Sequence, residues 1–111
     1  MQIVDAAGSY AAPGDGAPNT YVEQLRVPDL SVGTYSIPAG GVDDQTPHSE
    51  DEIYVVTAGR ARIVTDSGTA DVRPGDVIFV PAGEGHRFVD IAEDLALLVI
   101  FGPAYKSRAA T

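Results

Sequence analysis

Residues 75–86 read Gly-Asp-Val-Ile-Phe-Val-Pro-Ala-Gly-Glu-Gly-His, and this stretch combines a short apolar run with two turns. The run at 77–80 is rich in β-branched and aromatic residues and ends at Pro81, as strands commonly do. The glycines that follow allow a tight reversal of the chain, after which His86 opens another candidate strand at 86–90. The stretch therefore predicts two strands joined by a turn, with a histidine at the start of the second.

The same pattern of short strands and turns extends outward in both directions. Runs of β-branched and aromatic residues end repeatedly at Gly, Pro or Asp, and no segment keeps an apolar repeat of helical period. This spacing predicts an all-β sandwich or barrel with little helix. The other expected strands are 21–27, 30–37, 52–57, 60–65 (closed by a hairpin turn at 66–68) and 95–101.

The chain of 111 residues has the length of one domain. Residues 1–20 read as a short N-terminal strand, Met1–Val4, and a connector rich in Ala, Gly and Pro that is either flexible or an ordered arm. Residues 21–102 form the expected barrel. We expect residues 103–111 to be a frayed C-terminal tail.

The composition restricts the classes of partner and of chemistry. The formal net charge of −9 makes nucleic acid and anionic membrane surfaces poor partners. The absence of cysteine excludes disulfides, thiolate metal sites and cysteine nucleophiles. Because we see neither a signal peptide nor an apolar run of membrane-spanning length, we expect a soluble protein in the cytoplasm.

The chain has only two histidines, and both stand where metal chemistry would use them. His48 precedes a strand, and alternation along that strand would place Glu50, Glu52 and Tyr54 on the same face as His48. With His86, two imidazoles and one carboxylate match the ligand sets of non-haem iron and of catalytic zinc. The alternative is that each histidine is an ordinary surface or hydrogen-bonded residue and that the acidic run is a solvated strand edge.

Both histidine segments resemble the two sequence motifs of the cupin superfamily. The first motif, Gly-x5-His-x-His-x3-4-Glu-x6-Gly, is matched in register by residues 40–59, except that Thr46 replaces its first histidine. The second, Gly-x5-Pro-x-Gly-x2-His-x3-Asn, is matched by residues 75–90, except that Asp90 replaces its asparagine. The resemblance implies an antiparallel double-sheet jelly-roll β-barrel of six to eight strands.

The resemblance also implies one divalent transition metal per chain, Fe, Zn, Mn or Ni, held by His48, Glu52 and His86. Thr46 ligates such ions poorly, which leaves three arrangements open. The site uses three protein ligands and water; a nearby side chain fills the gap; or the site has lost its metal and become a binding pocket. We expect the first before the second, and the second before the third. The side chains that could fill the gap are Gln45, Asp44 and Glu50.

Strand alternation supplies further candidates for the lumen. Tyr54 shares its face with Glu52, so we place both as candidate catalytic residues. Other side chains line either the lumen or an ordinary packed core, and alternation cannot separate these two roles. They are Tyr35, Ile37, Phe79, Phe88, Leu97 and Val99.

These features favour a metal-dependent enzyme acting on a small organic molecule. The resemblance admits a dioxygenase, an isomerase, a lyase or a cyclase, so an oxidoreductase and an isomerase both remain open. The alternative is a non-catalytic module that binds a small ligand, and a third hypothesis is a structural dimer with a vestigial site. The resemblance also implies a homodimer, formed through sheet faces or through exchange of Met1–Val4.

Overall fold

A computed structural model of the chain describes residues 1–108. It contains eight strands, separated by turns and irregular loops, and residues 1–108 contain no helix that is long and apolar enough to cross a membrane. The strands are β1 (Thr20–Val27), β2 (Leu30–Ile37), β3 (Asp51–Ala58), β4 (Ala61–Thr65), β5 (Gly68–Val72), β6 (Val77–Val80), β7 (His86–Val89) and β8 (Leu95–Gly102).

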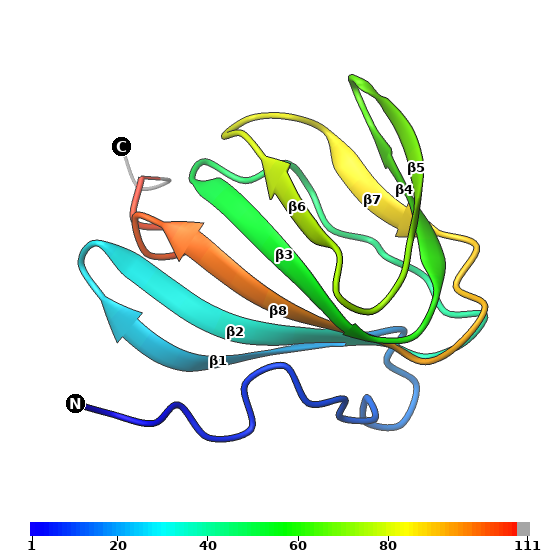
Figure 1. Cartoon of the computed structure of the whole chain (residues 1–111), viewed down its shortest axis with the longest axis horizontal. Helices are drawn as coiled ribbons and strands as arrows, with labels where there is room; N and C mark the ends of the chain where they lie inside the picture. The colour runs from blue at the N-terminus through cyan, green and yellow to red at the C-terminus, as the bar shows by residue number, and fades with distance from the viewer. Residues whose placement is uncertain (109–111) are drawn as a thin grey trace.

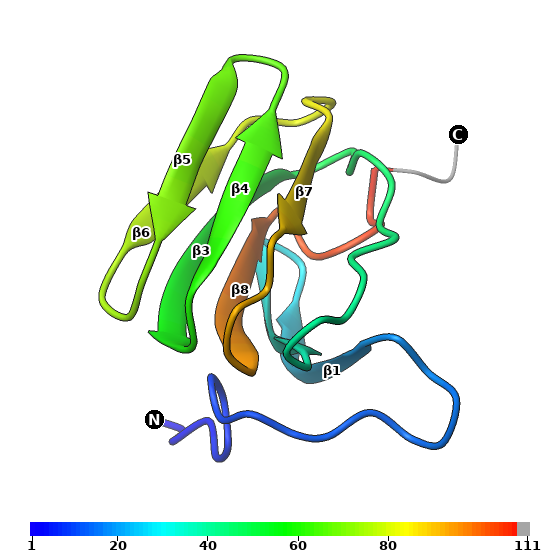
Figure 2. The ribbon, with the colours of Figure 1, turned by 90° about the vertical axis from the view of Figure 1, so that its right-hand side faces the viewer.

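The strands form two antiparallel sheets that face each other. One sheet has the order β1-β2-β8-β3-β6 and the other the order β5-β4-β7 (Figure 1). Figure 2 shows the smaller sheet laid over β6, β3 and β8 of the larger one. The predicted all-β jelly roll is confirmed. Its buried core lies between the sheets and draws large side chains from both, including Ile37, Leu95, Leu97, Val56 and Phe88.

Strand register decides which side chains face the interior. Glu52 pairs with Phe101 of β8 and with Val80 of β6, and Tyr54 pairs with Val99. Paired residues of antiparallel strands share a face, so these side chains all point between the sheets. Glu52 and Tyr54 are accordingly almost completely buried.

Gly59 makes the turn from β3 to β4 possible. Its φ of +87° lies in the left-handed region, and a Cβ atom added there would stand 2.3 Å from the carbonyl oxygen of Asp94. Only glycine meets both conditions at low cost. The turn directs the chain from the larger sheet into the smaller one.

Two sequence predictions about strands are wrong. The strand β5 was not expected, because Gly68–Val72 is short and has only two apolar side chains, Ala70 and Val72, of which only Val72 is buried. Phe79 does not face the lumen. It pairs with Ile53 on the outer face of the larger sheet and is 61% exposed, whereas Val80 points inward.

The N-terminal residues form an ordered arm rather than a strand and a flexible connector. Residues 1–19 contain no strand and run along the outer face of the larger sheet (Figure 1). The amide of Gly8 donates to Thr34 Oγ1 at 2.8 Å, the amide of Ala11 donates to Ser36 Oγ, and the hydroxyl of Thr57 donates to the Gly8 carbonyl. These bonds satisfy polar groups on strands β2 and β3.

The C-terminal tail is docked up to residue 108, so the expected fraying is wrong there; residues 109–111 lie outside the described residues. The Tyr105 ring stacks on Phe101 with a centroid distance of 4.5 Å. Glu50 accepts the backbone amides of Lys106 at 2.8 Å and of Arg108 at 2.9 Å. The tail therefore closes over one end of the barrel.

Candidate metal centre

The two motif segments meet at the end of the barrel near the tail. His48 lies in the loop before β3, while His86 begins β7 in the opposite sheet. The backbone amide of Gly83 donates to the carbonyl oxygen of His48 at 2.8 Å, which joins the turn of the second motif to the loop of the first. This bond holds the two imidazoles on facing walls, with ring centroids 5.2 Å apart.

His48, Glu52 and His86 converge as the sequence predicted. One potential ligand atom from each lies within 4.8 Å of the others. Glu52 Oε1 is 3.1 Å from His86 Nε2 and 3.8 Å from His48 Nε2. Ligand atoms each about 2.1 Å from one ion stand about 3.0–3.4 Å apart at octahedral or tetrahedral angles. Small side-chain adjustments would bring all three atoms to one divalent ion.

The polar atoms of this cluster test whether a cation fits. His86 Nδ1 is 2.9 Å from the Glu84 carbonyl, which can only accept, so Nδ1 carries a proton and Nε2, the nitrogen that faces Glu52, is the one that can bind a metal ion. Although Glu52 Oε1 stands at ion-pair distance from that nitrogen, it is buried and makes no hydrogen bond. A buried carboxylate oxygen without a hydrogen bond is costly, and a cation bound beside it would offset its charge. The residues therefore fit a bound cation.

The surroundings shift the pKa values of the two imidazoles in opposite directions. Burial lowers the pKa of His48, and the Glu52 carboxylate offsets only part of this effect. Burial also lowers the pKa of His86, but Glu52 and the Glu84 carbonyl outweigh it and raise that pKa overall. The raised pKa of His86 reflects the same uncompensated carboxylate that a metal ion would neutralise.

Gln45 and Tyr54 complete the ring of polar atoms. Gln45 Oε1 lies 2.8 Å from His48 Nε2, and the Tyr54 hydroxyl lies 3.0 Å from both Gln45 Oε1 and His86 Nε2. Burial and the charge of Glu52 raise the pKa of Tyr54 well above its ordinary value. Tyr54 therefore keeps its proton, and its hydroxyl has one hydrogen for two acceptors.

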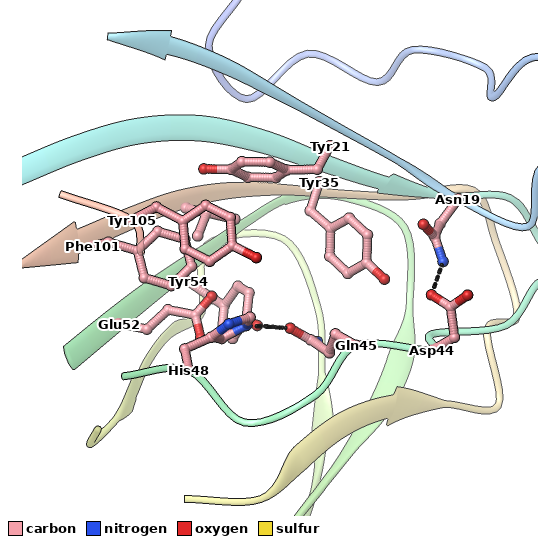
Figure 3. A pocket seen from close by; sticks show the side chains of 11 residues that line it. Asn19, Tyr21, Tyr35, Asp44, Gln45, His48, Glu52, Tyr54, Phe101 and Tyr105 are labelled. Atoms are coloured by element: carbon pink, nitrogen blue, oxygen red, sulfur yellow. Dashed lines mark hydrogen bonds and ion pairs between the residues drawn. The ribbon is translucent and has the colours of Figure 1, made fainter. Parts of the chain in front are cut away.

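Four residues of this polar cluster, Gln45, His48, Glu52 and Tyr54, line one wall of a pocket of about 160 Å³. A cavity of about 150 Å³ accommodates a molecule the size of benzene. Figure 3 shows aromatic rings above the cluster, with Asn19 bonded to Asp44 at the far end. The pocket is lined by Asn19, Tyr21, Tyr35, Asp44, Gln45, His48, Glu52, Tyr54, Val99, Phe101 and Tyr105.

Two residues that the sequence offered as replacements for the missing histidine are engaged elsewhere. Glu50 is buried against the tail, where it accepts two backbone amides and the Ser49 hydroxyl. It precedes β3, so strand alternation does not apply to it. Asp44 accepts Asn19 Nδ2 at 2.9 Å and does not belong to the polar cluster. Thr46 is exposed and does not line the pocket.

Sequence reasoning missed several pocket residues. Tyr105 was assigned to a frayed tail, although an aromatic residue in a polar tail is a signal for docking. Tyr21 lies at the start of β1, where its ring occupies the space that a side chain at Gly33 would need. Asp43 does not line the pocket but is buried behind Gln45, and it carries no sequence signal beyond its charge.

Comparison with known proteins identifies the family. Residues 33–101 match the family model of the cupin domain, and this match includes both histidine segments. The chain is a cupin. An uncharacterized protein of Streptomyces coelicolor is 44% identical to this cupin over 100 residues, which are 90% of this chain and 92% of that protein.

Solved structures support the same architecture. A double-stranded β-helix protein from Klebsiella pneumoniae superposes on the cupin with a TM-score of 0.78 and 16% identity, covering 93% of this chain and 91% of that one. KdgF from Halomonas sp. superposes with a TM-score of 0.71 and 20% identity, over 82% of this chain and 85% of KdgF. The DMSP lyase DddQ from Ruegeria pomeroyi superposes with a TM-score of 0.72 and 20% identity, over 86% of the cupin and 53% of the lyase. These likenesses establish the fold.

Proposed function

We propose that this cupin is a metal-dependent enzyme that acts on a small organic molecule. The observation that supports it is the buried, unbonded Glu52 Oε1, which faces two imidazole nitrogens on the wall of a pocket. His48, Glu52 and His86 hold one divalent transition metal, Fe, Zn, Mn or Ni, in this proposal. Such an ion supplies Lewis-acid chemistry, and iron adds oxidative chemistry.

The chain's own groups would bind and orient the substrate. The aromatic walls formed by Tyr21, Tyr35 and Phe101 exclude water from one side of a flat, small molecule. One glutamate against a divalent ion leaves about one positive charge, which favours an anionic or enolate-forming substrate. The pocket volume limits the buried part of that substrate to roughly the size of a substituted benzene ring.

Tyr54 and Glu52 are the proposed catalytic residues. The Tyr54 hydroxyl stands within 3.0 Å of His86 Nε2 and holds its proton because burial raises its pKa. It is therefore placed to donate a hydrogen bond, or a proton, to a substrate oxygen beside the cluster. Glu52 contributes the only carboxylate of the metal triad. A lyase, isomerase, cyclase or dioxygenase could each use this arrangement.

The first test is elemental analysis of tag-free protein purified without chelator, with the double variant His48→Ala/His86→Ala as its control. We expect about one transition metal per chain in the native protein and none in the variant. Absence of metal from both, even after reconstitution, would contradict the proposal. Turnover of small anionic substrates that is lost on chelation would support an enzyme, whereas tight binding without turnover would identify a non-catalytic binding module.

We also propose that the protein forms a homodimer through the outer face of the larger sheet. Ile53, Val77 and Phe79 form an exposed apolar strip along β3 and β6, at an edge of that sheet. Burial of this strip against a second copy would remove it from water. Sedimentation should show a dimer that Phe79→Glu converts to a monomer, and a monomeric native protein would refute this. The exchange of Met1–Val4 and a cytoplasmic location stay predictions from the sequence.

A further inference from the structure

We infer that the side-chain amide oxygen of Gln45 is the fourth protein ligand of the metal, in place of the histidine that position 46 lacks. This inference rests on the proposed metal site. Gln45 Oε1 accepts a hydrogen bond from His48 Nε2 at 2.8 Å, so a metal ion that binds both atoms would take the place of that proton. Two atoms that bind one ion of this kind stand at about 3 Å from each other. The oxygen thus already stands where a ligand adjacent to His48 belongs.

The orientation of the amide is fixed from behind. Gln45 Nε2 donates to Asp43 Oδ2 at 2.6 Å. A carboxylate only accepts hydrogen bonds, so the amide nitrogen must face Asp43 and the oxygen must face the cluster. The reversed amide would place its oxygen against the carboxylate and its NH2 group against His48.

Asp43 is itself held in place. It is buried and accepts the Tyr35 hydroxyl at 2.7 Å, the Phe88 backbone amide at 2.8 Å and the Gln45 backbone amide at 3.2 Å. These donors come from β2, β7 and the loop before β3, so the carboxylate is anchored to both sheets. A carboxylate behind a ligand that fixes its orientation is a recurring support in metal sites.

The loop before β3 explains why the side chain at position 45 reaches the polar cluster and the side chain at position 46 does not. Residues 38–50 form no strand, so the alternation that would favour the motif's own position does not hold there. Thr46 is exposed, whereas Gln45 is half-buried and lines the pocket. The long side chain of Gln45 reaches the cluster from the neighbouring position.

Replacing an imidazole by an amide oxygen keeps the charge of the site but changes its hardness. Both groups are neutral, so a divalent ion with Glu52 still carries about one net positive charge. Two nitrogens and two oxygens form a harder set than three imidazoles and a carboxylate. Relative to such a set, this site should favour Mn²⁺ or Fe²⁺ over Ni²⁺ and Cu²⁺.

The test compares Co²⁺ binding by the full chain and three variants. Gln45→Met keeps the side-chain length but offers a soft thioether, and Gln45→Asn keeps the amide but withdraws it by one methylene. Thr46→Ala is the matched control on the exposed neighbour. The readouts are the Co²⁺ affinity by calorimetry, the visible absorption of bound Co²⁺, and the Mn²⁺ affinity by electron paramagnetic resonance.

Loss of a group that merely supports a ligand commonly weakens metal binding about 10–100-fold, and a direct ligand should cost at least as much. We expect both Gln45 variants to bind Co²⁺ at least tenfold more weakly, with a changed absorption spectrum, and Gln45→Met to lose more affinity for Mn²⁺ than for Co²⁺. Thr46→Ala should match the native protein. Native affinity and spectrum in a folded Gln45 variant would overturn this inference alone, whereas a native protein that binds neither ion would overturn the proposed metal site as well.

Discussion

Substitution of Glu50 tests whether a buried carboxylate holds the C-terminal tail against the barrel. Glu50 Oε1 accepts the Lys106 amide, and Oε2 accepts the Arg108 amide and the Ser49 hydroxyl. Glu50→Gln replaces one of these two oxygens by an NH2 group, which cannot accept a hydrogen bond. At least one of the bonds to the charged carboxylate is therefore lost. Such a bond contributes about 1.5–3 kcal/mol.

Because the released amides at the tail can be solvated, we take the lower part of that range, a loss of about 2 kcal/mol in the free energy of unfolding. For a domain of this size the loss corresponds to a fall in Tm of about 8 °C. Urea denaturation followed by circular dichroism measures the first quantity, and hydrogen exchange at the Lys106 and Arg108 amides reports release of the tail. The control is Asp71→Asn, which removes an exposed partner of Arg62 and should cost less than about 0.5 kcal/mol.

Unfolding of Glu50→Gln at the same urea concentration as Asp71→Asn, with the Lys106 and Arg108 amides still protected, would refute a role for Glu50 in holding the tail. Protected amides together with a 2 kcal/mol loss would instead place the effect elsewhere in the barrel. Release of the tail should also weaken ligand binding, because Tyr105 forms part of the pocket wall.

Three further predictions concern the turn, the pocket and the metal. Gly59→Ala should lower the free energy of unfolding by about 2–3 kcal/mol in urea titrations, because the residue has positive φ and its new Cβ would meet the Asp94 carbonyl. Gly14→Ala, with open space around it, should change little. Gly33→Ala should displace the Tyr21 ring, whose hydroxyl would stand 2.1 Å from the new Cβ, and should weaken ligand binding in calorimetry without loss of metal; unchanged ligand affinity would contradict the Tyr21 placement. Chelation should lower Tm in calorimetric scans, because an ion at 100 times its Kd stabilises the folded state by about 2.7 kcal/mol, and an unchanged Tm would argue against a bound ion.

The sequence predicted most strands because the chain marks their ends with Gly, Pro and Asp. It predicted the convergence of His48, Glu52 and His86 because their motif spacing determines where the loop and turn place them. Strand alternation succeeded for Tyr54, whose strand is paired on both sides. It failed for Phe79, because both faces of β6 are apolar and only its pairing with β3 decides which face is buried.

The remaining errors have a common physical origin. The docking of Tyr105 and the position of Glu50 depend on hydrogen bonds between segments far apart in the chain, and the orientation of Gln45 depends on Asp43, which the distant Phe88 amide holds in place. Glu50 and Lys106, for example, are separated by 56 positions. Composition and local periodicity carry no information about such pairs, so the sequence could list the candidates to replace a histidine at Thr46 without choosing among them.

The position of β8 in the larger sheet affects how the molecule can be made. This strand is the last in residues 1–108, yet it lies between β2 and β3 and pairs with both. During synthesis, β2 and β3 emerge from the ribosome long before the strand that joins them. Until then each presents unpaired backbone groups, the feature that makes strand edges prone to association with other chains. Folding of this cupin should therefore be a late event, completed after residues 95–102 have left the exit tunnel, and nascent chains arrested before β8 should depend on chaperones to stay unaggregated.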